Sequence, residues 1–154
     1  MNHDGPTVRS TSLALERLVL GWDRYREAVA DELGVGTTEI VALGFLYHGG
    51  SHTPSEIGHL LNLTSGSVTA LLDRLESAAF VTRSQNPEDR RSLLATVTPA
   101  GRHAMQWYYE RLDEIVGRAL ERVSNIALDE VITLANSAGE LLDEHALAAK
   151  RSRP

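Results

Sequence analysis

The chain has 154 residues, of which 42% are apolar, so it is long enough to bury the core of one domain. It contains no cysteine, which excludes disulfides, thiolate metal sites and thiol-based redox sensing. No apolar run approaches the roughly 18 residues of a membrane span, and the amino terminus lacks the features of a secretory signal. These observations predict a soluble, cytoplasmic protein.

The formal net charge of −6 is spread unevenly along the chain. Residues 53–103 hold five acids and five arginines, whereas residues 104–147 hold nine acids and three arginines. The acidity therefore lies in the C-terminal part, and the neutral middle remains compatible with a nucleic-acid partner. A neutral surface predicts modest non-specific affinity for DNA.

The N-terminal third predicts a tail and two helices. Residues 1–10 are polar and are expected to form a disordered tail. Apolar residues then recur at spacings of three and four, which predicts a long amphipathic helix over residues 12–33. The Gly-Val-Gly sequence at 34–36 ends that helix, and a second helix is expected from residue 37 or 38 to residue 47.

Two short helices joined by a tight turn follow. Thr53-Pro54-Ser55-Glu56 has the pattern of a capping box with proline at the first helical position, and this helix should end near Asn62. The next helix should begin after Thr64, whose hydroxyl can accept the backbone N–H of Ser67. This arrangement predicts a helix-turn-helix.

The second of these helices has two different faces. An apolar stripe is formed by Val68, Leu71, Leu72 and Leu75. The opposite face is small and rich in hydroxyl groups, so it could lie in the major groove of DNA, where Ser and Thr contact bases or phosphates. It comprises Ser65, Gly66, Ser67, Thr69, Ala70 and Asp73.

A β-hairpin is predicted after this helix. Residues 80–83 and 93–97 favour strands, and Asn86-Pro87 marks the turn between them. The tip of the hairpin carries Arg90 and Arg91. Two arginines alone are also typical of a solvated turn, but a helix followed by such a hairpin is the arrangement of a winged helix.

Several motifs in this stretch resemble the MarR family of bacterial transcriptional regulators. The run Asn86-Pro87-Glu88-Asp89-Arg90-Arg91, followed by Leu94, Val97, Thr98 and Gly101, is similar to that family's wing signature. Leu72-Asp73-Arg74-Leu75-Glu76 is similar to the end of its recognition helix. The resemblance covers about residues 12–147. It implies an α+β, mainly α fold: a winged helix-turn-helix with long N- and C-terminal dimerisation helices.

The C-terminal part predicts two more long helices. One should start at Thr98-Pro99 and continue to about residue 123, and the other should run from residue 128 to about 148. We expect a single domain over residues 11–148, with a reading head at about 37–98 and a basic tail at 149–154. The long helices at 12–33 and 99–148 could pack as a monomeric bundle. The resemblance favours a homodimer, which would place two recognition helices about 34 Å apart on a palindromic operator.

The predicted DNA contacts on the recognition helix are hydroxyl groups and one arginine. Ser65, Ser67 and Thr69 would contact the groove and Thr64 a phosphate, although a solvated face remains the alternative. Arg74 would either reach a phosphate or pair with a nearby acid such as Asp73 or Glu76. Ala70 departs from the arginine often found at that position in the family, which leaves the operator sequence open.

In the wing, Arg91 is the candidate for insertion into the minor groove, and Arg90 would contact phosphate. Asp89 is expected to hold the Arg91 guanidinium by a charge-assisted hydrogen bond. Asn86 stands where the family often has aspartate, and it can make the same turn-stabilising bond.

The resemblance also implies a small, often anionic and aromatic effector that binds between the reading head and the dimer helices. Residues that could line such a cleft are Trp22, Tyr25, His48, His103 and Trp107, although residues of these types more often belong to the core or the surface. His48 and His52 could start a metal site, with His59 and His103 as possible partners. No metal site is expected, however, because the glycines after His48 break the helix that would align the pair and the chain has no cysteine. No cofactor is expected.

The sequence contains none of the motifs that would indicate an enzyme, such as a glycine-rich phosphate loop, HExxH or Gly-x-Ser-x-Gly. It predicts a dimeric, sequence-specific DNA-binding regulator, in particular a repressor relieved by a small ligand. The alternative is a dimeric interaction or ligand-binding protein with the same fold and weak DNA binding, which the acidic balance and Ala70 favour. The intact Arg90-Arg91 pair favours the regulator.

Overall fold

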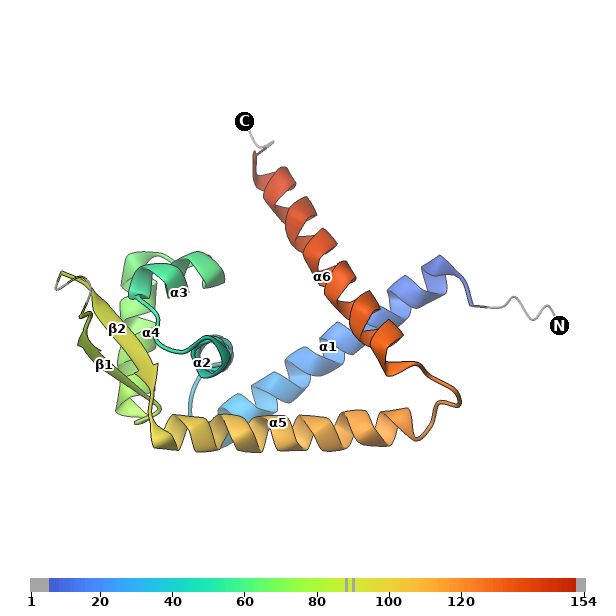
Figure 1. Cartoon of the computed structure of the whole chain (residues 1–154), viewed down its shortest axis with the longest axis horizontal. Coiled ribbons are helices and arrows are strands. Elements are labelled where there is room, and N and C mark those ends of the chain that lie inside the picture. Colours follow the sequence, from blue (N-terminus) through green and yellow to red (C-terminus); the bar gives the residue numbers. More distant parts are fainter. Residues whose placement is uncertain (1–5, 88, 90, 152–154) are drawn as a thin grey trace. The chain divides into compact units, whose positions relative to one another are not determined.

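A computed structural model of the chain describes residues 6–87, 89 and 91–151. The chain divides into two compact units, Met1–Glu110 and Arg111–Pro154, and each is described by itself. The described elements are α1 (Val8–Leu33), α2 (Thr37–Gly49), α3 (Pro54–Leu61), α4 (Ser65–Ser77), β1 (Val81–Gln85), β2 (Leu93–Val97), α5 (Pro99–Leu120) and α6 (Leu128–Arg151) (Figure 1). The predicted α+β, mainly α fold is confirmed. Among these described helices, none has the length and apolar character needed to cross a membrane.

Helix α1 begins earlier than the sequence predicted. Thr7 caps it through a capping box in which Ser10 takes the place usually held by Glu or Gln. The expected tail at residues 1–10 is therefore wrong for residues 8–10, while residues 1–5 lie outside the described part. At the other end of the chain, α6 extends to Arg151, so the predicted tail at 149–154 begins too early.

The ends of three helices carry residues in the left-handed conformation. Gly34 (φ 66°) follows α1, Asn62 (φ 53°) follows α3 and Ala79 (φ 59°) follows α4. After α4 the backbone N–H groups of Ala79 and Phe80 donate to Glu76 and Leu75, each at 2.9 Å, which is a Schellman motif. These tight ends turn the chain sharply between α1 and α2, between α3 and α4, and from α4 into β1.

The core of the first unit forms where the helices α2, α3 and α4 meet the hairpin and the start of α5. All four residues of the predicted apolar stripe on α4 are at most 1% exposed, so that prediction is confirmed. Complete burial of such a side chain stabilises the fold by about 1.5–3 kcal/mol. The largest other buried side chains in the unit include Leu43, Leu46, Ile57 and Met105.

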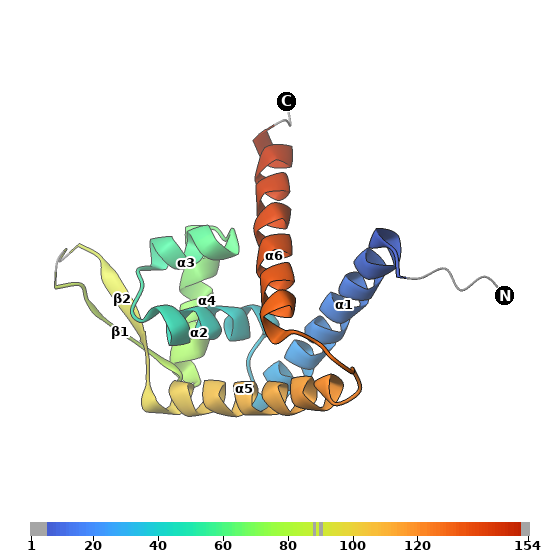
Figure 2. The same cartoon turned by 45° about the vertical axis from the view of Figure 1, so that its right-hand side comes forward.

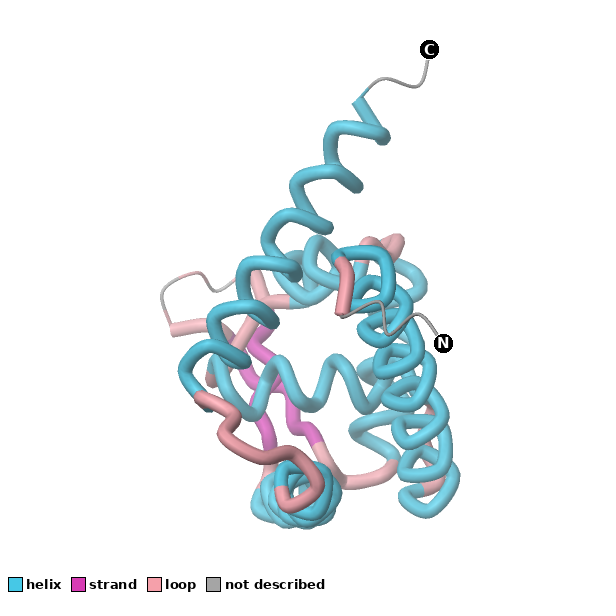
Figure 3. Tube along the Cα trace, turned by 90° about the vertical axis from the view of Figure 1, so that its right-hand side faces the viewer, coloured by secondary structure: helices cyan, strands magenta, loops and turns pink. Residues whose placement is uncertain are grey.

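Strands β1 and β2 form an antiparallel pair in the register Val81↔Val97 through Gln85↔Leu93 (Figure 3). The predicted second strand has the observed bounds, whereas the first begins one residue later and ends two residues later than expected. His52, predicted to lie in a helix-breaking segment, adds a bridge to Ala95 through two backbone hydrogen bonds of 2.8 and 3.1 Å. The bridge ties the α2–α3 connection to the middle of β2.

Helix α5 starts as the sequence predicted. Thr98 accepts the backbone N–H of Gly101 at 3.0 Å and donates its hydroxyl to Ala79 at 2.6 Å. A side chain at Gly101 would bring its Cβ to 2.2 Å from the Phe80 carbonyl oxygen, so only glycine fits this close approach. This contact explains the glycine in the motif after the hairpin.

The second unit contains the end of α5, a turn at residues 121–127, and α6. None of the α6 side chains described is buried. Large apolar residues are instead exposed, and they include Val131, Ile132, Leu134, Leu141 and Leu142. A helix with this much exposed apolar surface is stabilised mainly by tertiary or quaternary packing.

Candidate nucleic-acid interface

The helix-turn-helix is built from α3, the turn at Asn62 and α4 (Figure 2). Thr53 and Glu56 form the predicted capping box, with Thr53 N–H donating to Glu56 at 2.7 Å. These bonds lower the pKa of the Glu56 carboxyl below its ordinary value. Thr64 caps α4 as predicted and accepts the backbone N–H of Ser67 at 3.3 Å. The two caps fix where each helix begins.

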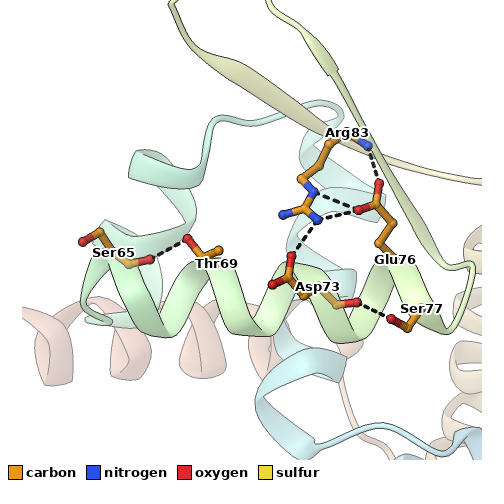
Figure 4. Close-up of polar contacts among 6 residues, drawn as sticks. All are labelled: Ser65, Thr69, Asp73, Glu76, Ser77 and Arg83. Atoms are coloured by element: carbon orange, nitrogen blue, oxygen red, sulfur yellow. Dashed lines mark hydrogen bonds and ion pairs between the residues drawn. The ribbon is translucent and has the colours of Figure 1, made fainter.

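The predicted groove contacts share the exposed N-terminal half of α4. Ser65, Ser67 and Thr69 are all exposed, as is Thr64. The hydroxyls of Thr64 and Ser67 lie 2.9 Å apart. Thr69 donates its hydroxyl to the carbonyl of Ser65 at 3.0 Å (Figure 4). Because the proton of Thr69 is used inside the helix, this side chain offers a ligand its oxygen lone pairs and its methyl group.

Arg74 does not pair with either of the acids that the sequence suggested. Its guanidinium instead forms an ion pair with Glu39 of α2, with Nε donating to Oε1 at 2.5 Å. The Glu39 side chain is 4% exposed and that of Arg74 is 59% exposed. The pair therefore fastens α4 to the first turn of α2, and the arginine still presents an outer surface. The phosphate contact predicted for Arg74 stays a prediction.

Asp73 and Glu76 pair with Arg83 of β1. Arg83 Nη2 donates to Asp73 at 2.6 Å, and its Nε donates to Glu76 at 3.0 Å (Figure 4). The hydrogen bonds that the guanidinium donates to Glu76, and then those to Asp73, raise the pKa of Arg83 above its ordinary value. Sequence reasoning missed Arg83. It is two residues after the buried Val81 and so lies on the same face of β1, but the sequence alone does not show which residues it meets there.

The turn of the wing is closed by side chains that flank its two strands. Asn86 Nδ2 donates to the hydroxyl of Ser92 at 3.0 Å, consistent with the turn-stabilising bond expected of it. Asp89 accepts the backbone N–H of Arg91 at 3.0 Å rather than the guanidinium that the sequence predicted, because an aspartate two residues earlier closes an Asx turn. Arg91 is exposed, and Arg90 lies outside the described residues.

A cleft of about 430 Å³ lies in the first unit beside α1, α2 and α5. Of the predicted ligand residues, Trp22 and His48 line it, together with Arg26, Tyr108 and Tyr109. His48 Nε2 is 2.8 Å from the Tyr109 hydroxyl. Burial raises the Tyr109 pKa above its ordinary value, so the phenol stays protonated at neutral pH.

The other predicted ligand residues lie elsewhere. Tyr25 donates its hydroxyl to the carbonyl of Tyr108 at 2.8 Å and so fastens α1 to α5. His103 is exposed and Trp107 is half-buried, and neither lines the cleft. Among residues 6–87, 89 and 91–151 there is no cluster of three or more His, Asp or Glu that could hold a metal ion.

The fold and this site define a winged helix-turn-helix protein. Comparison with known proteins shows the family to which it belongs. A model of the MarR family matches residues 37–93. The chain is 35% identical over 108 residues to the HTH-type transcriptional regulator YkoM of Bacillus subtilis, covering 70% of each protein. It is 30% identical over 112 residues to the multiple antibiotic resistance protein MarR of Salmonella typhimurium, covering 73% of this chain and 76% of that one.

The structure of reduced AbfR bound to DNA has the same fold, with a TM-score of 0.59 and 20% identity over 90% of this chain and 93% of that one. This chain belongs to the MarR family of helix-turn-helix transcriptional regulators. The resemblance inferred from its wing and recognition-helix motifs is confirmed. Its relatives are regulators and not enzymes.

Proposed function

We propose that this protein is a cytoplasmic, homodimeric repressor that binds a palindromic operator with α4 in the major groove and the wing in the minor groove. The observation that carries the proposal is the pairing of an exposed, hydroxyl-rich half of α4 with an exposed Arg91 at the end of the adjoining hairpin. Hydroxyl groups and the α4 N-terminus suit base edges and phosphates. An arginine suits a narrow minor groove.

The homodimer is supported by apolar surface that one chain leaves uncovered. In α6, Ile132 is 60% exposed and Leu142 is 70% exposed. In α1, Leu18 and Val19 are 60% and 58% exposed. Surfaces of this kind usually mark an interface between proteins. A two-fold dimer presents two recognition helices to two half-sites, which compensates for a reading head that has no excess positive charge.

Relief by a small ligand is supported by the cleft that Trp22 and His48 line. Its aromatic walls and the guanidinium of Arg26 suit a flat anionic compound such as an aromatic carboxylate. Arg26 also pairs with Asp23 at 2.9 Å, so an anion would compete with that carboxylate. A ligand that favours one spacing of the two reading heads would shift the dimer away from the spacing that fits the operator.

The test is a fluorescence-anisotropy titration of the purified protein on DNA from upstream of its own gene, with competitor DNA, at two salt concentrations. We expect saturable, competitor-resistant binding at nanomolar protein, and a steep loss of affinity at the higher salt. Addition of benzoate or a related aromatic carboxylate should weaken binding and quench Trp22 fluorescence. Binding that competitor abolishes would instead favour an interaction protein with this fold.

A further inference from the structure

Arg83 is surrounded by carboxylates of the recognition helix. It lies on β1, three residues before the wing turn at Asn86, and its side chain reaches back to α4 (Figure 4). Its Nη2 donates to Asp73 at 2.6 Å and to Glu76 at 2.5 Å, and its Nε donates to Glu76 at 3.0 Å. Its backbone N–H also donates to Glu76, at 3.3 Å. One residue therefore joins the wing strand to α4 through both main chain and side chain.

These contacts leave Arg83 poorly suited to bind a phosphate. Its side chain is only 23% exposed, whereas those of Asp73 and Glu76 are 56% and 40% exposed. Two of its three guanidinium nitrogens already donate to carboxylates. An approaching phosphate would meet Asp73 and Glu76 beside the guanidinium and would be repelled by both.

The same contacts fix the direction in which the wing leaves the helix. Asp73 is four residues after Thr69, on the exposed side of α4, and Arg83 is on the strand that leads to Arg91. The hairpin has two strands, and a two-stranded hairpin is only marginally stable by itself. Its orientation therefore depends on its contacts with the rest of the fold, among them the His52–Ala95 bridge. A planar guanidinium held by two carboxylates resists both motions, because its hydrogen bonds have fixed directions.

We propose that Arg83 is a positioning residue for DNA binding. It holds the wing at the angle to α4 that lets Arg91 enter the minor groove while α4 occupies the major groove, and it does not itself contact DNA. This inference rests on the proposed DNA-binding function and adds a role for a residue outside the predicted interface.

The decisive variant removes the carboxylates and keeps the arginine. Asp73→Asn with Glu76→Gln makes the reading head more positive and frees Arg83. We expect operator affinity to fall about five- to tenfold while affinity for competitor DNA does not fall, because the wing loses its alignment. If Arg83 were a phosphate contact held back by these acids, operator affinity would rise. Unchanged or increased operator affinity overturns the proposal.

A double-mutant cycle with Arg91 tests the coupling between the two arginines. In the wild-type background Arg91→Ala should weaken operator binding by about five- to 150-fold. In an Arg83→Met background, Arg91→Ala should weaken operator binding less than threefold, because in a misaligned wing Arg91 no longer reaches the minor groove. Arg83→Lys keeps the positive charge and most of the aliphatic side chain but loses the planar guanidinium. In this background the effect of Arg91→Ala should lie between those in the wild-type and Arg83→Met backgrounds. Independent, additive effects of the two arginines overturn the proposal.

Wing alignment is also measurable without DNA. The chain has no cysteine, so Ser65→Cys and Pro87→Cys introduce a single pair of spin labels into each chain, and dilution with unlabelled protein removes pairs between chains. We expect one narrow distance distribution by double electron–electron resonance, which broadens with Asp73→Asn/Glu76→Gln. An unchanged distribution overturns the proposal. Because this readout needs no operator, failure of wild-type DNA binding would count against the proposed function alone.

Discussion

At the scale of single residues, Arg91 has the most direct consequence for function. It is exposed at the end of the wing, and its backbone N–H is held by Asp89. Arg91→Ala should weaken operator binding by about 1–3 kcal/mol, because it removes the side chain proposed for the minor groove. Anisotropy titrations against the operator give this difference. Arg17→Ala, which removes the same charge from the exposed surface of α1, is the matched control and should change affinity much less. Equal effects of the two changes would contradict the assignment.

The ion pair between Glu39 and Arg74 predicts an asymmetry. Arg74→Met leaves a carboxylate that is 4% exposed without its cation, whereas Glu39→Gln leaves an arginine that is 59% exposed and that water can solvate. We expect the free energy of unfolding to fall by on the order of 2 kcal/mol for Arg74→Met and by about 1 kcal/mol or less for Glu39→Gln. Both losses are smaller than the loss expected when a fully buried ion pair is broken, because water reaches Arg74. Urea unfolding measures both, and an equal or reversed order would refute the asymmetry.

At the scale of elements, the end of α4 is strained at one residue. Ala79 has φ 59° in the Schellman turn, a conformation that costs any residue with a Cβ about 1 kcal/mol or more relative to glycine. Ala79→Gly should therefore raise the free energy of unfolding by about 0.5–1 kcal/mol, after the larger chain entropy of glycine in the unfolded state is subtracted. Ala78→Gly is the control: Ala78 is right-handed (φ −77°), so this change should destabilise. A lower melting temperature for Ala79→Gly would contradict this reading.

Elements governed by local signals were predictable from the sequence. The caps at Thr53, Thr64 and Thr98 depend on residues three positions apart, and the apolar stripe on α4 depends on spacings of at most three between successive residues. All are observed. The capping box at Thr7 was missed because serine replaces the usual acid. The positive φ at Ala79 was missed because alanine gives no signal for it.

Contacts between distant elements could not be read from the sequence. Arg74 had two acids close by, yet its partner is Glu39, 35 positions earlier, because packing brings the first turn of α2 against α4. Trp22 and Tyr108 are 86 positions apart, and the hydrogen bond between them, 3.1 Å long, depends on how α1 packs against α5. The aromatic residues of the cleft were identifiable as a type, but which of them meet was decided by the fold.

At the scale of the whole molecule, the uncovered apolar surface of α6 predicts a dimer that single charges can weaken. Ile132→Glu and Leu142→Glu place a carboxylate at positions that are 60% and 70% exposed in one chain. If these positions are buried in the dimer, each change should raise the dimer dissociation constant at least tenfold, as measured by sedimentation equilibrium. Asn136→Glu adds the same charge at an exposed polar position of α6 and should change the dimer dissociation constant little. A wild-type monomer, or equal effects at all three positions, would rule out this interface.

A hydroxyl-radical footprint of the protein on its own upstream DNA decides whether it binds an operator as a two-fold dimer. A two-fold dimer with α4 in the major groove predicts two protected half-sites about 34 Å apart, related by a dyad and flanked by minor-groove protection. Arg91→Ala should remove the flanking protection and leave the central pattern. Protection of one isolated half-site, or none that survives competitor DNA, would contradict a dimeric operator-binding regulator.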